Sequence, residues 1–446
     1  MEPHISRRHL LLGTGLSLAG ASGSSVWAQN APPGARRQDA GRLVVVLLRG
    51  AYDGLSAFVP YADADYYSMR PGIAIAAPDG SMQTALKLDN TFALHPALAP
   101  LMPMWQQGVF GFVPAAGLPA PNRSHFDAQY QMEIAQSGKT SASPGWLNKV
   151  AALHSPSATS ALGVGEANPA ILAGQAVVKL IPRGQAAQRT GVLANDRTRQ
   201  ALLDLYAGND KVSEAFRQGA GSRMQSAQEL TAEKAAADNR RDMAMREASA
   251  LDRDGTPASV QAQNAQMLAA SNGASDPVGL QLDAQHLGTL MRNDRKLRIG
   301  FLSAGGWDTH ANQGNLTGQL ANNLSNLGRG LAQLLQYFSE PDDVIVVLSE
   351  FGRTAAENGT RGTDHGFGNA MWLIGNRING GRWHGAWTGL SRGNLNEARD
   401  LPAHHDYRAV LAQVLRATFL LPESALAQVL PGTTWDSRLD GVMRKA

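Results

Sequence analysis

Short, uninterrupted apolar runs alternate along this chain with segments in which apolar residues recur at helical spacing. Such a run is too short for a helix and is typical of a strand buried on both faces, as in a parallel sheet. These runs occupy residues 43–48, 109–113, 297–303, 344–348 and 370–374. Helical spacing predicts helices at 96–107, 124–135, 197–206, 316–338 and 407–420, and a strand or hairpin is expected near 171–181. The alternation predicts an α/β fold with one large, mostly parallel sheet flanked by helices.

The N-terminal segment has the features of an export signal. Arg7 and Arg8 directly precede the short apolar run 10–19, and Val26-Trp27-Ala28 offers a small-residue cleavage site. This pattern predicts a twin-arginine signal peptide at 1–28 and a mature protein in the periplasm or outside the cell. The polar residues 29–41 are then a linker, and 42–446 form the α/β domain.

Residues 216–275 differ from the rest of the domain. They contain few large apolar residues and many Ala, Gln and charged residues, and their helical stretches are broken at Gly255-Thr256-Pro257. This composition predicts a solvated helical insertion. The sequence leaves open whether the insertion covers a site or binds a protein partner.

Composition narrows the class of protein. The chain is 43% hydrophobic over 446 residues, enough to bury a sizeable core. The formal charge of +3 falls to +2 once Arg7, Arg8 and Glu2 leave with the signal, which gives no basis for a nucleic-acid partner. Cysteine is absent, so disulfides and thiolate metal sites are excluded. No stretch approaches the roughly 20 apolar residues of a membrane span.

Chemically active side chains follow the predicted strands. In parallel sheets, sites form at the carboxyl ends of the strands. Glu350 and Arg353 come directly after the run 344–348, and the next loop carries Asp364 and His365. Asp53 follows the run 43–48, where Asp53-Gly54 can equally form a tight turn.

Two further segments add to this set. Asp308 and His310 follow the run 297–303 and, two residues apart in extended chain, can face one ion together. Ser124 begins a helical segment, flanked by Arg123 and His125. A serine there is either a helix cap or a hydroxyl activated at an anion-binding helix N-terminus.

Taken together, these residues predict a metal site at one edge of the sheet. Oxygen ligands with two imidazoles suit Zn²⁺ or Mn²⁺, whereas an oxygen-dominated subset would suit Ca²⁺ or Mg²⁺. We therefore expect Zn²⁺ or Mn²⁺ rather than Ca²⁺ or Mg²⁺. The candidate ligands are Asp53, Asp308, His310, Glu350, Asp364 and His365.

The signal and the segments 43–54, 122–127, 305–310 and 349–366 resemble exported bacterial proteins grouped as a sulfatase-like domain of unknown function. That family is placed in the alkaline phosphatase and sulfatase superfamily. The resemblance implies an alkaline phosphatase-like fold. It implies metal binding by Asp53, Asp308, His310 and His365, with Ser124 as nucleophile.

The sequence departs from the superfamily pattern at three points. One residue separates Asp308 from His310 where the enzymes have three, and Phe351 stands where they have a histidine ligand. Asp364 is expected to compensate for that histidine. Ser124 is followed by His-Phe-Asp, so conversion to the aldehyde of sulfatases is not expected.

The resulting hypothesis is an exported metal-dependent hydrolase of phosphate or sulfate esters, acting on a small molecule or a glycan. Ser124 would attack the ester, His125 or His310 would supply the proton, and Arg123 or Arg353 would share the developing charge. The alternative is a non-catalytic, metal-containing binding or structural protein that kept the fold. Transfer or isomerisation of a phosphate group is a third, weaker option, because phosphorylated metabolites are inside the cell.

Overall fold

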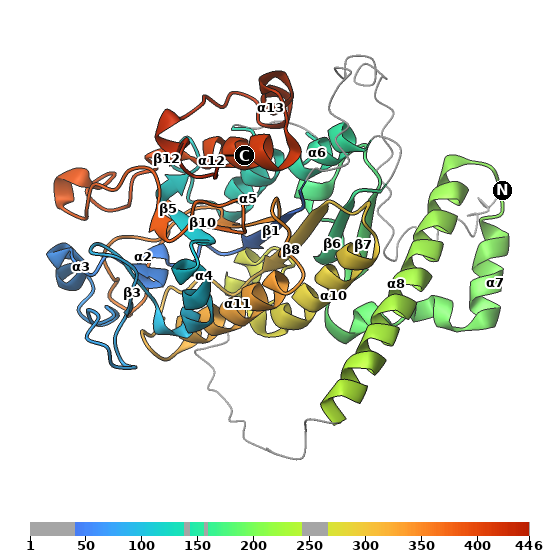
Figure 1. Cartoon of the computed structure of the whole chain (residues 1–446), viewed down its shortest axis with the longest axis horizontal. Coiled ribbons are helices and arrows are strands. Elements are labelled where there is room, and N and C mark those ends of the chain that lie inside the picture. Colours follow the sequence, from blue (N-terminus) through green and yellow to red (C-terminus); the bar gives the residue numbers. More distant parts are fainter. Residues whose placement is uncertain (1–40, 138–142, 156–158, 243–265, 446) are drawn as a thin grey trace, which may run out of the picture.

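A large mixed sheet runs through the centre of the molecule (Figure 1). The computed structural model describes residues 41–137, 143–155, 159–242 and 266–445, so the predicted signal and most of the linker lie outside the described residues. Within this part of the chain the sheet has nine strands. Their order is β11 (Arg382–Trp383), β5 (Phe110–Gly117), β10 (Asn369–Ile374), β9 (Val344–Ser349), β1 (Leu43–Leu48), β8 (Ile299–Ala304), β6 (Ala161–Gly165) and β7 (Val178–Pro182), with β12 (His405–Asp406) beside β5.

The strands of this sheet are mostly parallel, as the sequence predicted. β1 pairs in parallel with β8 and β9, and β6 pairs in parallel with β7 and β8. Among the described strands of this large sheet, only β10 runs antiparallel to its neighbours, β5 and β9. A second, small antiparallel sheet contains β2 (Phe58–Val59), β4 (Ala93–Leu94) and β3 (Leu86–Lys87).

Helices cover both faces of the large sheet. Leu43, Val45 and Leu47 of β1 pack in the core on one face, whereas Val44 and Val46 pack in the core on the other. The first face is covered by α5 (His125–Ile134), α6 (Trp146–His154), α12 (Tyr407–Phe419) and α13 (Glu423–Val429), and the second by α10 (Leu280–Asn293) and α11 (Gln319–Leu335) (Figure 1). This two-sided burial explains why β1 is apolar at every position.

Proline and glycine account for some of the differences between predicted and observed elements, whereas α6 and α10 were not predicted. The expected helix 96–107 is a 3₁₀ helix, η2 (Pro96–Leu101), followed by the short α4 (Met102–Gln106). Pro100 and Pro103 lack the N–H groups that a continuous α-helix needs. The strand expected near 171–181 is confirmed only as β7, and β6 was missed because its glycines, Gly163 and Gly165, weaken the strand signal.

Within the segment 216–275, residues 216–242 and 266–270 are helical, and 271–275 form a turn and irregular chain. α8 (Lys211–Asp242) begins before this segment, and both α8 and α7 (Asp196–Leu205) are drawn at the right of Figure 1. Phe216 of α8 stacks on Tyr206 at the end of α7, with the ring centres 4.2 Å apart. Residues 243–265 lie outside the described part, and a helix at 266–270 returns the chain to the sheet. There, Gly305 N donates to Ser275 O at 2.6 Å and Gly306 N to Ser271 Oγ at 3.0 Å. No described helix is long and apolar enough to cross a membrane.

Folding stability should depend on pH through His286 of α10. Burial lowers the pKa of this side chain to about 4, whereas an unfolded histidine titrates near about 6.5. Below pH ~6.5 His286 is therefore protonated in the unfolded chain but stays neutral in the folded protein. The free energy of unfolding falls as the pH is lowered from ~6.5 to about 4, where the folded protein binds the proton too. We expect the urea midpoint to drop between pH 7 and pH 5, and to drop less in His286→Gln. Equal drops in both proteins would contradict this assignment.

Candidate metal centre

Strand register brings three loops together at one edge of the sheet. Leu48, the last residue of β1, lies opposite Ala304 of β8 and Ser349 of β9. The segments 49–53, 305–310 and 350–353 therefore leave the sheet side by side. Because the antiparallel β10 starts at this same edge, the loop 350–368 stays there too. The loops approach so closely that Gly50, with a φ of +114°, leaves no room for a Cβ beside Asp308 N.

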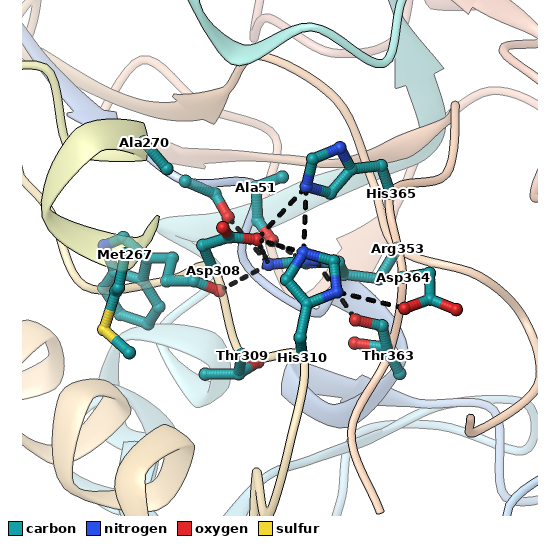
Figure 2. A network of polar contacts seen from close by, with 12 residues as sticks. Ala51, Met267, Ala270, Asp308, Thr309, His310, Arg353, Thr363, Asp364 and His365 are labelled. Carbon is teal, nitrogen blue, oxygen red and sulfur yellow. Dashed lines mark hydrogen bonds and ion pairs between the residues drawn. The ribbon is translucent and has the colours of Figure 1, made fainter. Parts of the chain in front are cut away.

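Nitrogen atoms of three histidines meet around one carboxylate oxygen at this edge. His310 Nε2 lies 2.9 Å, His365 Nε2 3.2 Å and His125 Nε2 3.4 Å from Asp308 Oδ1. The Nε2 atom of His365 is also 2.9 Å from that of His125 and 3.0 Å from that of His310. Figure 2 shows His310 and His365 pointing toward Asp308 from two different loops.

Each of the three rings is held through its other nitrogen. His125 Nδ1 lies 2.7 Å from Glu350 Oε1, His310 Nδ1 3.0 Å from Asp364 Oδ1, and His365 Nδ1 2.8 Å from the Arg123 carbonyl oxygen. A carboxylate or carbonyl oxygen only accepts, so each Nδ1 donates. In a neutral ring Nε2 then carries the lone pair, and it faces the shared centre. Metal-ligating histidines have this arrangement.

The geometry fits a divalent ion. His125, Asp308 and His365 each place one ligand atom within 4.8 Å of the others. Their separations of 2.9, 3.2 and 3.4 Å are close to the ~3.3–3.4 Å expected around a tetrahedral ion with bonds of ~2.0–2.1 Å. Two facing Nε2 lone pairs at 2.9 Å also need a proton or a cation between them. Imidazole nitrogen with one carboxylate suits Zn²⁺ or Mn²⁺.

Burial and charge set the protonation of this group. Burial lowers the pKa of His125, but its bonds to Asp308 and Glu350 outweigh burial and raise the pKa to about 9. For Asp308, burial acts to raise the pKa, yet the three histidines and Arg353 hold it well below its usual range. The Asp308 carboxylate therefore stays charged across the physiological range, and a bound cation would replace the second proton of His125.

A cleft of about 450 Å³ opens onto these atoms. Its walls combine the start of α5 with the helical segment 266–270, and its lining is Arg123, Ser124, His125, Phe126, Gln266, Ala269, Ala270, Asp308, His310 and His365. Ser124 is exposed at the N-cap of α5, where Oγ accepts from Asp127 N at 3.5 Å. The Arg123 guanidinium donates to Glu397 and Asp400 at 2.6 and 2.5 Å. The hydrogen bond from Asp127 N confirms that Ser124 is a helix cap, and Ser124 also lines the cleft.

Asp53 is not brought to the group of ligand atoms. Its carboxylate is buried and binds Arg70 through contacts of 2.6 and 3.1 Å, and it also accepts from Ser56 and Gln313. Burial acts to raise the pKa of Asp53, but the Arg70 charge lowers it overall. In this structure Asp53 is one half of an internal ion pair.

Arg353 is buried beneath Asp308 rather than exposed in the cleft. Its guanidinium donates to Asp308 Oδ1 at 2.5 Å and to the carbonyl oxygens of Ala51 and Trp307 at 2.7 and 3.1 Å. Figure 2 shows it close to Asp308 and Ala51. The geometry makes Arg353 a residue that positions Asp308, because its side chain has no exposed surface with which to meet a substrate.

Glu350 and Asp364 do not face the shared centre but hydrogen-bond to Nδ1 of His125 and His310, respectively, and so orient these two rings. Glu350 is fully buried, and Asp364 also accepts from Asn358 Nδ2 at 3.0 Å. Phe351 packs against His125 with the ring centres 4.8 Å apart, so it forms an apolar wall. The sequence argument missed Arg70 and also Gln129, which donates to Glu350 at 2.9 Å. The spacing of four residues between His125 and Gln129 on a helix was the available signal.

Residues 40–430 match a family model described as a protein of unknown function, DUF1501. The chain belongs to the DUF1501 family. No curated protein matches its sequence. The predicted membership of a domain-of-unknown-function family is therefore confirmed, and this membership by itself assigns no activity.

The two aspartates should behave differently when they are changed. Asp308→Asn should lower Zn²⁺ affinity by at least about tenfold, because it weakens the one carboxylate among the ligand atoms. Asp53→Asn should keep wild-type affinity but lose about 3–5 kcal/mol of stability, because the buried Arg70 charge loses its partner. Chelator competition measures affinity and urea unfolding measures stability. A loss of zinc from Asp53→Asn equal to that from Asp308→Asn would make Asp53 a ligand.

Proposed function

We propose that this protein is an exported, metal-dependent hydrolase of phosphate or sulfate esters with an alkaline phosphatase-like fold and Ser124 as its nucleophile. One observation carries the proposal: ligand atoms of His125, Asp308 and His365 converge in a cleft that the Ser124 hydroxyl also lines. Structural zinc sites are usually closed by four protein ligands, whereas catalytic ones keep an open position. An open cleft over three protein ligands favours catalysis.

The proposal gives each residue a separate task. When bound, a divalent ion supplies Lewis-acid stabilisation of charge on the transferred group and favours the deprotonated serine. His125, Asp308 and His365 hold that position, and the free N–H groups at the start of α5 face the anionic group. Asp308 is kept charged and in place by Arg353.

His310 is the residue that we assign to proton transfer. Its side chain is 33% exposed, and Nδ1 is fixed by Asp364. The hydrogen bond to Asp308 raises the pKa of His310, which favours the protonated form that an acid catalyst needs. In the proposed reaction Ser124 Oγ, whose proton has been released to solvent, forms its bond to phosphorus or sulfur as the ester bond breaks, and the leaving alcohol takes a proton from His310. Water then returns a proton to His310 and attacks the seryl ester as hydroxide, which breaks the bond to Ser124 Oγ and restores the deprotonated serine.

Ser124→Ala tests the nucleophile. We expect turnover of aryl phosphate or aryl sulfate to fall at least about a thousandfold, with zinc affinity unchanged. The substitution also removes a helix cap, which costs about 1 kcal/mol. Asn195→Ala is the matched control, because Asn195 caps α7 by accepting from Thr198 N at 2.9 Å, away from the cleft. Unchanged turnover in Ser124→Ala would remove the serine mechanism.

His310→Gln and His365→Gln should separate proton transfer from metal binding. His310→Gln should retain zinc and lose turnover most strongly for esters with poorly acidic alcohols, since these leave only with a proton. His365→Gln should lose zinc, because its Nε2 is one of the three central ligand atoms. Elemental analysis and a leaving-group series measure the two effects. Equal zinc loss in both variants would make His310 a ligand instead.

The second candidate is a non-catalytic protein in which the ion is structural or binds an anionic glycan or a protein partner. Two observations favour it: Phe351 packs where the superfamily resemblance expects a histidine ligand, and Asp53 is paired with Arg70. Both leave fewer groups for a second ion. Bound zinc without turnover of either ester class in protein purified from the exported fraction would favour this candidate over the hydrolase.

A further inference from the structure

Gln129 makes three hydrogen bonds to parts of the chain that are far apart in sequence. It lies one turn after His125 on α5, and its side chain is fully buried. Its amide nitrogen donates to Glu350 Oε1 at 2.9 Å and to the Ala270 carbonyl oxygen at 2.7 Å. Its amide oxygen accepts from Arg49 Nη1 at 3.0 Å. One amide therefore links the histidine-orienting carboxylate, the segment 266–270 and a buried arginine.

The partners determine which way this amide points and which side chain can occupy the position. Arginine only donates, so it must face the amide oxygen, whereas a carboxylate and a carbonyl only accept and must face the NH₂ group. Arg49 is itself fixed by Glu133 and Glu166 at 2.8 and 2.7 Å. Among the standard side chains of this size, an amide alone offers two donors and an acceptor in this arrangement.

Glu350 depends on this bond. It is fully buried, and its Oε1 accepts from Gly50 N, His125 Nδ1 and Gln129 Nε2 at 2.7, 2.7 and 2.9 Å. A buried carboxylate stays charged only while such donors compensate for its lost hydration. Removing Gln129 would therefore weaken the acceptor that holds the His125 ring and its Nε2 lone pair in place.

Residues 266–271, which we call the cleft wall, depend on the same amide. Ala269 and Ala270 line the cleft, and Ala270 is fixed by the Gln129 bond. Ser271 Oγ accepts from Gly306 N at 3.0 Å, two residues before Asp308. The cleft wall is thus bonded both to α5, which carries His125, and to the loop that carries Asp308.

We propose that Gln129 is a positioning residue that couples the cleft wall to metal binding through Glu350 and His125. A bound ion would hold His125 Nε2 in place and so restrict motion of the His125–Glu350 pair. Because the Gln129 amide donates to both Glu350 and the Ala270 carbonyl oxygen, motion of the cleft wall would be restricted as well. The inference rests on the metal centre of the proposed function but not on ester hydrolysis.

The test compares zinc affinity with backbone hydrogen exchange in the full-length mature protein. In the wild type, Zn²⁺ should slow exchange of amides in 266–275. Gln129→Met keeps the length of the side chain but has neither N–H donor. Its zinc affinity should fall about tenfold, the lower limit of the effect typical of residues that hydrogen-bond to metal ligands. Zinc should also no longer slow exchange of the amides in 266–275. Gln129→Glu keeps the shape of the side chain but places a carboxylate, which only accepts, against Glu350. Its zinc affinity should therefore fall by at least as much as that of Gln129→Met.

Asn148→Leu is the matched control for general destabilisation. Asn148 is a buried amide on α6 that donates to the carbonyl oxygens of Leu172 and Ala176, both at 2.9 Å, and so also ties a helix to a loop. This variant should be destabilised but keep wild-type zinc affinity and wild-type protection of 266–275.

Several outcomes would overturn the inference. The inference is wrong if the Gln129 variants fold and, like Asn148→Leu, keep wild-type zinc affinity and wild-type slowing of exchange by zinc in 266–275. If the Gln129 variants do not fold, the wild-type experiment still decides, because the coupling is wrong if zinc binds without slowing exchange in 266–275. A wild-type protein that binds no zinc would overturn the metal centre itself, and with it the proposed function.

Discussion

The candidate site depends on one buried guanidinium. Arg353 has no exposed side-chain surface and donates to the carbonyl oxygens of Gly50 and Ala51 after β1, of Trp307 after β8, and of Thr363 in the loop before β10. Its remaining contact is the Asp308 carboxylate. A buried charge without partners is strongly unfavourable, so the three loops can satisfy Arg353 only in one mutual arrangement. That arrangement is also the one that gathers the histidines.

Around this anchor the polar groups are arranged in two layers. The inner layer contains imidazole nitrogens and the Asp308 oxygen, which face a common point. The outer layer contains Glu350, Asp364 and the Arg123 carbonyl, which only accept hydrogen bonds and so fix the tautomer of each ring. The low-dielectric surroundings strengthen these bonds. The start of α5 belongs to both layers, since Ser124 and His125 are adjacent there.

Much of the fold was predictable because its central strands are buried on both faces. β1 is apolar throughout, and its predicted bounds agree with the observed Leu43–Leu48. The prediction was weaker where local signals conflict: prolines turned an expected helix into η2 and α4, and glycines hid β6. For the site, Asp308, His310 and His365 were named correctly as neighbours, because parallel strands end at one edge.

The sequence by itself determined which residues follow the strands and therefore which can reach the common edge. Only the tertiary structure decided what each of them does there. Asp53 and Asp308 follow β1 and β8 at similar positions, yet Asp53 meets Arg70 while Asp308 meets three histidines. Glu350 orients His125 because Gln129 and Gly50, far away in sequence, supply the other donors. Local patterns encode backbone conformation and the buried face, whereas the pairing of buried charges depends on contacts between separate segments, 17 residues apart for Asp53 and Arg70 and 225 residues apart for His125 and Glu350.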